Sequence, residues 1–176
     1  YYMYTARRQP IVIVRGDGVR VWDEDGEEYL DFTAGWAVNN IGHCNPAVVD
    51  AVVEQSKRLM QTSNAFYTVP QLELAELLVE NSCLDKIFFS NSGAEANEGA
   101  VKLARKYGKM HRNGAYEIIT AMNSFHGRTL VTAAATGQPH YHEIIEPVPS
   151  GFVYVSFDDV DAIKKATTER TVAVML

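Results

Sequence analysis

Small and hydroxyl-bearing residues gather where an apolar segment meets a long helical pattern. The stretch FFSNSGAEAN places Ser92, Gly93 and Ala94 at the start of a helix that the residue spacing predicts over 94–109. Such a start offers free backbone N–H groups and the positive end of the helix dipole, which suits a phosphate. Gly93 and Ala94 let the backbone approach closely, and Ser92 adds a hydroxyl donor. An ordinary Ser or Asn cap with a tight glycine turn explains the same residues equally well.

A second group of chemistry-bearing residues, NSFHGRT over 123–129, follows another apolar segment. Phe125 can stack on a flat ring, and Arg128 can hold a carboxylate through a two-pronged contact. The alternative is structural, with Phe125 in the core, His126 at a polar edge and Arg128 in a surface ion pair. Together, the two groups describe a site for a phosphorylated aromatic cofactor and an amino acid.

Alternating apolar and helical patterns along the second part of the chain position both groups. Strands are expected over 86–90, 116–121, 152–156 and 171–176, with helices between them. This alternation is typical of an α/β layer with a mostly parallel sheet, in which ligands bind beyond the carboxyl ends of the strands. Because each group directly follows a strand, both are expected at that edge.

The first part of the chain has a different pattern. Runs rich in β-formers over 11–32 alternate with Gly-Asp and Asp-Gly turns, which predicts a small antiparallel meander. Helices are expected over 46–60, with Asn45 as N-cap, and over 70–83. The change of pattern predicts an N-terminal segment over 1–60 and an α/β domain over 61–176.

Composition excludes several classes of protein. Of the 176 residues, 47% are hydrophobic and 22% are charged, as in globular proteins. The net charge of −6 gives no indication of a nucleic-acid-binding face, and no apolar run is long enough to span a bilayer. The chain starts without a signal-peptide core, and Cys44 and Cys83 are expected to be reduced thiols. We therefore expect a cytoplasmic protein without nucleic-acid or membrane partners.

Motifs for other ligands are weak. No Walker A run is present, and GDGVRV lacks the third glycine of the dinucleotide-binding fingerprint. His140 and His142 share one face of a segment expected to be extended, but no third ligand lies nearby, so no metal site is expected.

Four longer stretches resemble the class III aminotransferases, namely WDEDGEEYLDFTAGWAVNNIGH, FFSNSGAEANEGAVKLARKYG, SFHGRT and ATGQPHYH. These enzymes depend on pyridoxal 5′-phosphate and have the fold type I architecture. The resemblance implies that Ser92, Gly93 and Ala94 bind the cofactor phosphate, that Phe125 packs on the pyridine ring, and that Arg128 binds the substrate α-carboxylate.

The same resemblance implies amino-acid and 2-oxo-acid substrates and a homodimer with a shared active site. An N-acetylornithine-like donor and 2-oxoglutarate are expected. Enzymes that use ornithine, succinylornithine or 4-aminobutyrate share these motifs and remain alternatives.

The resemblance also implies a lysine that holds the cofactor and an aspartate that pairs with its pyridine nitrogen. In the family both follow the strand that matches TVAVML, so they are expected beyond Leu176 and no catalytic residue is expected within this chain. A buried parallel strand is also rarely a chain terminus. We therefore expect a longer parent protein, and a non-catalytic fragment is the alternative to an enzyme.

Overall fold

The computed structural model describes every residue from Tyr1 to Leu176, and the chain forms two compact units. The first unit comprises Tyr1–Glu73 and the second Leu74–Leu176. The domains predicted over 1–60 and 61–176 concern the complete protein and stay a prediction. None of the helices combines the length and apolar character that a bilayer span requires.

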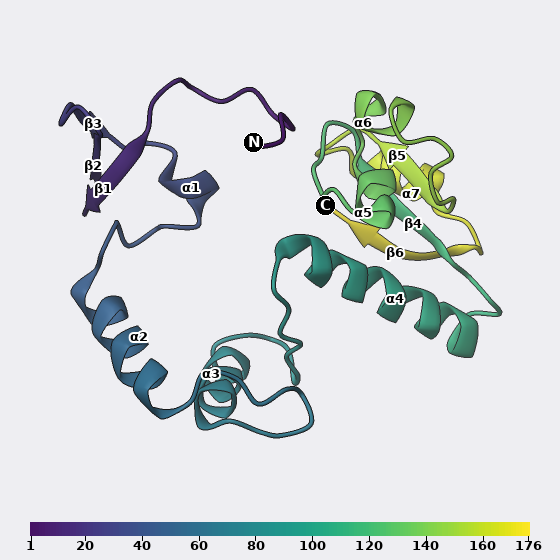
Figure 1. Ribbon diagram of the computed structural model, residues 1–176. Coiled ribbons are helices and arrows are strands. Elements are labelled where there is room, and N and C mark those ends of the chain that lie inside the picture. The colour runs from purple at the N-terminus through teal and green to yellow at the C-terminus, as the bar shows by residue number, and fades with distance from the viewer. The chain divides into compact units, whose positions relative to one another are not determined.

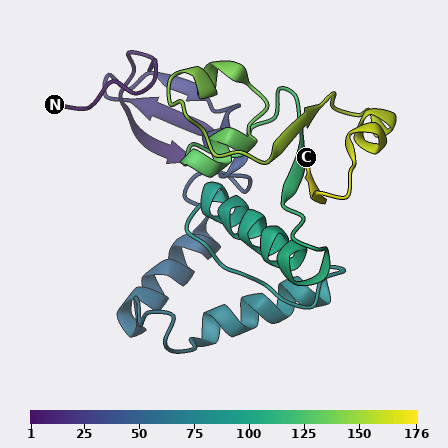
Figure 2. The ribbon, with the colours of Figure 1, turned by 90° about the vertical axis from the view of Figure 1, so that its right-hand side faces the viewer.

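A three-stranded antiparallel sheet lies in the first unit, which confirms the predicted meander. Its strands are β1 (Ile13–Asp17), β2 (Arg20–Asp23) and β3 (Glu28–Leu30), and β2 lies between the other two (Figure 2). The first turn comes later than the RGDG pattern indicates, because β1 continues to Asp17 and pairs it with Arg20. Gly18 makes this turn at a φ of 55°, a backbone conformation that glycine adopts without a steric penalty.

The helices of this region follow the sequence pattern closely. α2 (Pro46–Arg58) begins as predicted, with the Asn45 side chain accepting a hydrogen bond from Ala47 N at 3.1 Å. α3 (Val69–Glu80) occupies the second predicted helix. α1 (Ala34–Ala37) is a left-handed turn, since its four residues all have φ values between 45° and 62°.

A parallel sheet organises the second unit, as the alternating pattern predicts. Its strands are β4 (Glu117–Ala121), β5 (Phe152–Val155) and β6 (Thr171–Met175), in the order β5-β4-β6. Ile119 pairs with Val153 on one side and with Val174 on the other. All five residues of β4 are buried, so the core of this unit lies around its central strand.

Four helices accompany the parallel sheet. α4 (Gly93–His111) packs along β6 (Figure 1), and α7 (Val160–Ala166) packs on β5. α5 (Leu130–Ala135) contacts both α4 and the short α6 (Pro139–Glu143). Thr129 caps α5 by accepting a hydrogen bond from Thr132 N, so the helix begins directly after the stretch NSFHGRT.

The strand predicted over 86–90 is wrong. This segment has no regular structure and pairs with no other strand of the chain. Its two aromatic side chains are exposed, Phe88 by 72% and Phe89 by 40%. An apolar run becomes a strand only where its backbone groups find a partner, and no neighbour is available here.

The extended conformation predicted for HYH is also wrong, because this segment forms α6 with Pro139 in its first turn. Proline favours a helix start, since its N–H would be unsatisfied there in any case. His142 Nε2 lies 2.7 Å from Thr136 O, whereas the His140 ring lies beside Tyr141. The two histidines therefore face different neighbours.

Candidate functional site

A cavity of about 580 Å³ opens at the carboxyl edge of the parallel sheet. Its walls are residues 121–126 after β4, Phe157 after β5, Met175 and Leu176 at the end of β6, and Asn97 of α4. Parallel α/β sheets bind their ligands at this edge. The cavity therefore lies where the sequence predicts the site.

The start of α4 has the properties that a phosphate requires. Ser92 is the N-cap, and its Oγ accepts a hydrogen bond from Glu95 N at 3.2 Å. The N–H groups of Gly93 and Ala94 belong to the first turn and have no partner within the helix. A side chain added at Gly93 would meet no atom within 4 Å, so the approach is open. The capping alternative is confirmed for Ser92, and it leaves the hydroxyl hydrogen free to donate.

The structural alternative for the second group is wrong. Phe125 is 55% exposed and lines the cavity instead of filling the core. Arg128 is exposed and forms no ion pair, and its guanidinium carbon lies 5.9 Å from the centroid of the Phe125 ring. His126 is buried instead of lying at a polar edge.

The two groups, 29 or more residues apart in sequence, touch in the structure. A Cβ added at Gly127 would lie 2.8 Å from Ala94 Cβ, so the stretch NSFHGRT packs directly on the start of α4. Asn97 Nδ2 donates to His126 O at 2.8 Å across the same contact. Ser92, Gly93, Ala94 and Arg128 do not themselves line the cavity.

The sequence analysis assigned no part in the site to Asn97 or His126, although both line the cavity. Asn97 lies four residues after Gly93, so helical spacing places both on one face, and this signal was available. His126 is 7% exposed, its Nε2 has no hydrogen-bond partner within the chain, and burial lowers the pKa of the ring and favours the neutral form. No local pattern indicates this burial, because it depends on the packing of Thr136 against the His126 backbone.

The residues present fit a flat, phosphorylated cofactor. They supply unpaired N–H groups at a helix start, small residues beside them and an exposed aromatic ring facing a cavity. No lysine lines the cavity. No group of three or more His, Cys, Asp or Glu side chains is arranged to hold a metal ion.

Fold and site together define an α/β protein with an open helix start beside a cavity at the carboxyl edge of a parallel sheet and an exposed aromatic side chain in the cavity wall. The sequence matches the family described as aminotransferase class-III over residues 1–175. The chain belongs to this family, whose members have fold type I and depend on pyridoxal 5′-phosphate. The predicted fold class and cofactor are thereby confirmed.

Relatives with about half of their residues identical are acetylornithine aminotransferases. The one from Methanocaldococcus jannaschii is 52% identical over 177 residues, which cover 100% of this chain and 44% of the relative. The one from Caldanaerobacter subterraneus is 51% identical over 100% of this chain and 45% of its own length. The chain therefore spans less than half the length of these relatives.

Solved structures of the same family superpose well on the chain. The ornithine aminotransferase from Toxoplasma gondii gives a TM-score of 0.92 at 32% identity and covers 98% of this chain and 42% of its own. N-acetylornithine aminotransferase from Stenotrophomonas maltophilia gives 0.78 at 40% identity, with the same coverage of 98% and 42%.

Proposed function

We propose that the complete protein is an aminotransferase that moves the terminal amino group of an N-acetylornithine-like donor to 2-oxoglutarate, as part of arginine biosynthesis. The observation that carries the choice of donor is the 52% and 51% identity to two acetylornithine aminotransferases. By family resemblance, the proposal includes a cytoplasmic homodimer with a shared active site.

The start of α4 is proposed to hold the cofactor phosphate. The N–H groups of Gly93 and Ala94 and the hydroxyl of Ser92 all lie in one helical turn. They donate toward a negative group that the helix dipole also favours. Pyridoxal phosphate, when bound, supplies an electron sink and a carrier for the amino group.

The stretch NSFHGRT is proposed to bind the cofactor ring and the substrate. Phe125 presents an exposed ring to the cavity, which suits stacking on a pyridine. The Arg128 guanidinium is beside that ring and carries no acidic partner, so it is free to bind a carboxylate. The amino donor and the oxo acid both carry a carboxylate, and one arginine serves both in turn.

A donor panel tests the proposed reaction. The complete protein is assayed with 2-oxoglutarate and with acetylornithine, succinylornithine, ornithine or 4-aminobutyrate. A single methylene in a pocket changes kcat/KM by about 10- to 200-fold. Acetylornithine differs from ornithine by a whole acetyl group, so we expect it to lead ornithine by at least about tenfold. A higher kcat/KM for ornithine would favour the activity that the Toxoplasma gondii structure is named for.

A second candidate is that the 176 residues alone are non-catalytic. The absence of lysine from the cavity walls favours it. The test is borohydride reduction of the complete protein loaded with pyridoxal phosphate, followed by peptide mapping. We expect the labelled lysine to lie outside the 176 residues. A label on Lys86, Lys102 or another lysine of this chain would contradict the expectation.

A further inference from the structure

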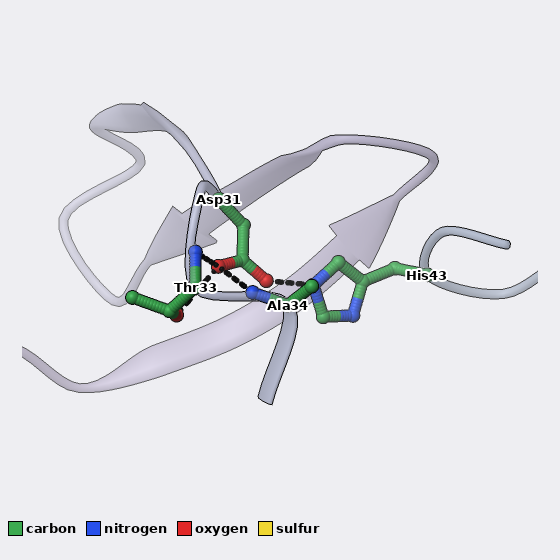
Figure 3. Close-up of polar contacts among 4 residues, drawn as sticks. All are labelled: Asp31, Thr33, Ala34 and His43. Carbon is green, nitrogen blue, oxygen red and sulfur yellow. Dashed lines mark hydrogen bonds and ion pairs between the residues drawn. The ribbon is translucent and has the colours of Figure 1, made fainter. Parts of the chain in front are cut away.

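Asp31 closes a hydrogen-bond network in the loop after β3 (Figure 3). Its Oδ1 accepts from the backbone N–H of Thr33 at 3.0 Å and of Ala34 at 2.9 Å, and from the Thr33 hydroxyl at 2.8 Å. Its Oδ2 lies 2.8 Å from His43 Nε2. An ionised carboxylate only accepts hydrogen bonds, so His43 Nε2 carries a proton.

The other ring nitrogen of His43 also faces an acceptor. The Asn39 carboxamide satisfies its neighbours when its Nδ2 donates to Gly42 O at 2.9 Å, an orientation assigned from the hydrogen-bond network. Its oxygen then accepts from His43 Nδ1 at 3.0 Å and from His43 N at 3.2 Å. With an acceptor at each nitrogen, the geometry is that of a doubly protonated ring.

The network is anchored on the β1–β2 turn. A Cβ added at Gly16 would lie 2.7 Å from His43 Cγ, so the ring packs on the backbone of β1. His43 N donates to Gly18 O at 2.7 Å, and Gly18 N donates to His43 O at 3.0 Å. The charged residues of this turn are Asp17, which makes no ion pair, and Arg20, which pairs with Glu28. Asp31 is the charged group bonded to the ring.

We propose that His43 and Asn39 form a latch on the loop 39–43 that opens when His43 loses its Nδ1 proton. In the closed state, the Asn39 oxygen accepts from the ring and from the backbone of His43. Without the Nδ1 proton, a ring lone pair faces that oxygen. The carboxamide then turns over to donate its own N–H to Nδ1, and it gives up its bonds to Gly42 O and His43 N.

The latch is coupled to the turn that carries Trp36. Asp31 holds the backbone of Ala34 and the ring of His43 with the same carboxylate. Ala34, Trp36 and Ala37 of α1 have positive φ, a conformation that non-glycine residues keep only where surrounding contacts impose it. Trp36 is 94% exposed at this turn, so opening of the latch loosens the segment that presents it.

Hydrogen exchange on the complete protein tests the latch. Backbone protection of residues 37–44, corrected for intrinsic exchange, is measured at about pH 5.5 and about pH 8.5, because histidine is the side chain that commonly changes its charge in this range. We expect protection to fall about two- to tenfold at the higher pH, which is the range that one net hydrogen bond represents. Protection over α2 (Pro46–Arg58) serves as the control and is expected to stay constant.

Two variants make the test specific to the proposed pair. His43→Gln has no titrating ring, so the ratio of protection between the two pH values is expected to approach one. Asn39→Ala has no carboxamide to accept from the ring or to donate to it, so the ratio is expected to shrink. Because the readout is a ratio within each variant, a general loss of stability does not imitate the effect. Equal protection of the unmodified protein at both pH values, or an undiminished ratio in His43→Gln, would overturn the proposal.

Discussion

At the scale of single residues, Arg128 and Arg170 differ in whether they have an ion-pair partner. Arg170 pairs with Glu117 at 3.1 Å, whereas Arg128 is exposed beside Phe125 without a carboxylate. A charged side chain that stabilises no ion pair contributes little to folding. Its exposed guanidinium is therefore available to a ligand, and the proposed function assigns it the substrate carboxylate.

Replacement of Arg128 tests that role directly. We expect Arg128→Ala to raise KM for 2-oxoglutarate about 10- to 150-fold in the complete protein, since a hydrogen bond to a charged group contributes about 1.5–3 kcal/mol. Arg128→Lys is expected to recover part of the lost affinity for 2-oxoglutarate. Lysine keeps the positive charge but lacks the planar guanidinium that binds a carboxylate through two parallel hydrogen bonds. Steady-state kinetics and thermal unfolding check both variants. The exposed Arg112→Ala is the control, and an unchanged KM in Arg128→Ala would contradict the assignment.

At the same scale, the Asp31 carboxyl makes the stability of the fold depend on pH. The bond from His43, then those from Thr33 and Ala34, hold the pKa of this carboxyl well below its usual value of about 3.9. The folded state thus binds the proton less tightly than the unfolded state. The contribution to stability is complete above about pH 4 and is lost as the pH falls through the folded-state pKa.

We therefore expect Asp31→Asn to lower the unfolding temperature of the complete protein near neutral pH. The gap to the unmodified protein is expected to narrow steadily below about pH 4, where the native carboxyl also becomes protonated. Unfolding followed by circular dichroism across pH provides the measurement. Asp50→Asn, at an exposed position of α2, is the matched control. A gap that stays constant down to the lowest pH would show that ionisation of Asp31 is irrelevant.

Residue types predicted the position of the candidate site better than its internal contacts. Ser92 and Gly93 lie at a helix start and Phe125 lies behind β4, as predicted, but the strand expected before Ser92 is absent and neither Ser92 nor Gly93 lines the cavity. The burial of His126 and the contact between Gly127 and Ala94 were not predictable, since both depend on how the α5 region packs.

At the scale of elements, α4 joins the site to the sheet, and two of its glycines have opposite surroundings. A Cβ at Gly108 would collide with Ala115 O and lie 3.0 Å from Val172 Cγ2, so this glycine lets the helix end approach the segment before β4. A Cβ at Gly99 would lie 3.1 Å from the end of the Phe88 ring. Phe88 is 72% exposed, so its side chain is able to move aside.

The same substitution at these two positions is expected to have opposite effects. Gly99→Ala is expected to stabilise the protein by up to about 1 kcal/mol, because alanine is the better helix former. Gly108→Ala gains the same helix propensity, but its methyl group forces the end of α4 away from the backbone of Ala115. We therefore expect a net destabilisation of about 1–3 kcal/mol. Denaturant unfolding of the complete protein measures both. Equal effects of the two substitutions would contradict the close approach at Gly108.

Elements were predictable where local chemistry decides them. The capping of α2 by Asn45 and the meander of β1 to β3 follow from residues close in sequence. The segment 86–90 has the composition of a strand and no partner to pair with, and Pro139 starts a helix where an extended segment was expected. Both errors arose because alternation of residue types cannot reveal what lies beside a segment.

At the scale of the whole molecule, the chain leaves much apolar surface exposed. α2 and α3 contain no buried residue, and their apolar side chains are largely exposed. Val52 of α2 is 63% exposed, and Leu77 of α3 is 57% exposed. Phe88 and Leu103 of the second unit are also largely exposed. Large apolar patches on a protein surface usually mark contacts with other residues or subunits. The chain spans less than half the length of its relatives, and we expect the remainder of a complete protein to cover part of this surface.

The exposed apolar faces of α2 and α3 lead to a prediction for the chain as a whole. We expect residues 1–176 expressed alone to bind a hydrophobic dye such as ANS strongly and to self-associate, because exposed apolar surface drives both. The complete protein is expected to bind the dye weakly and to unfold in a sharper transition. Dye fluorescence and sedimentation velocity on both proteins make the comparison.

A substitution on the exposed face of α2 extends the test. Val52→Asp is expected to reduce self-association of the short chain. In the complete protein, the same substitution is expected to destabilise the fold, because there it would place a charge in a covered face. Weak dye binding by a monomeric short chain would instead mean that the exposed faces of α2 and α3 need no partner.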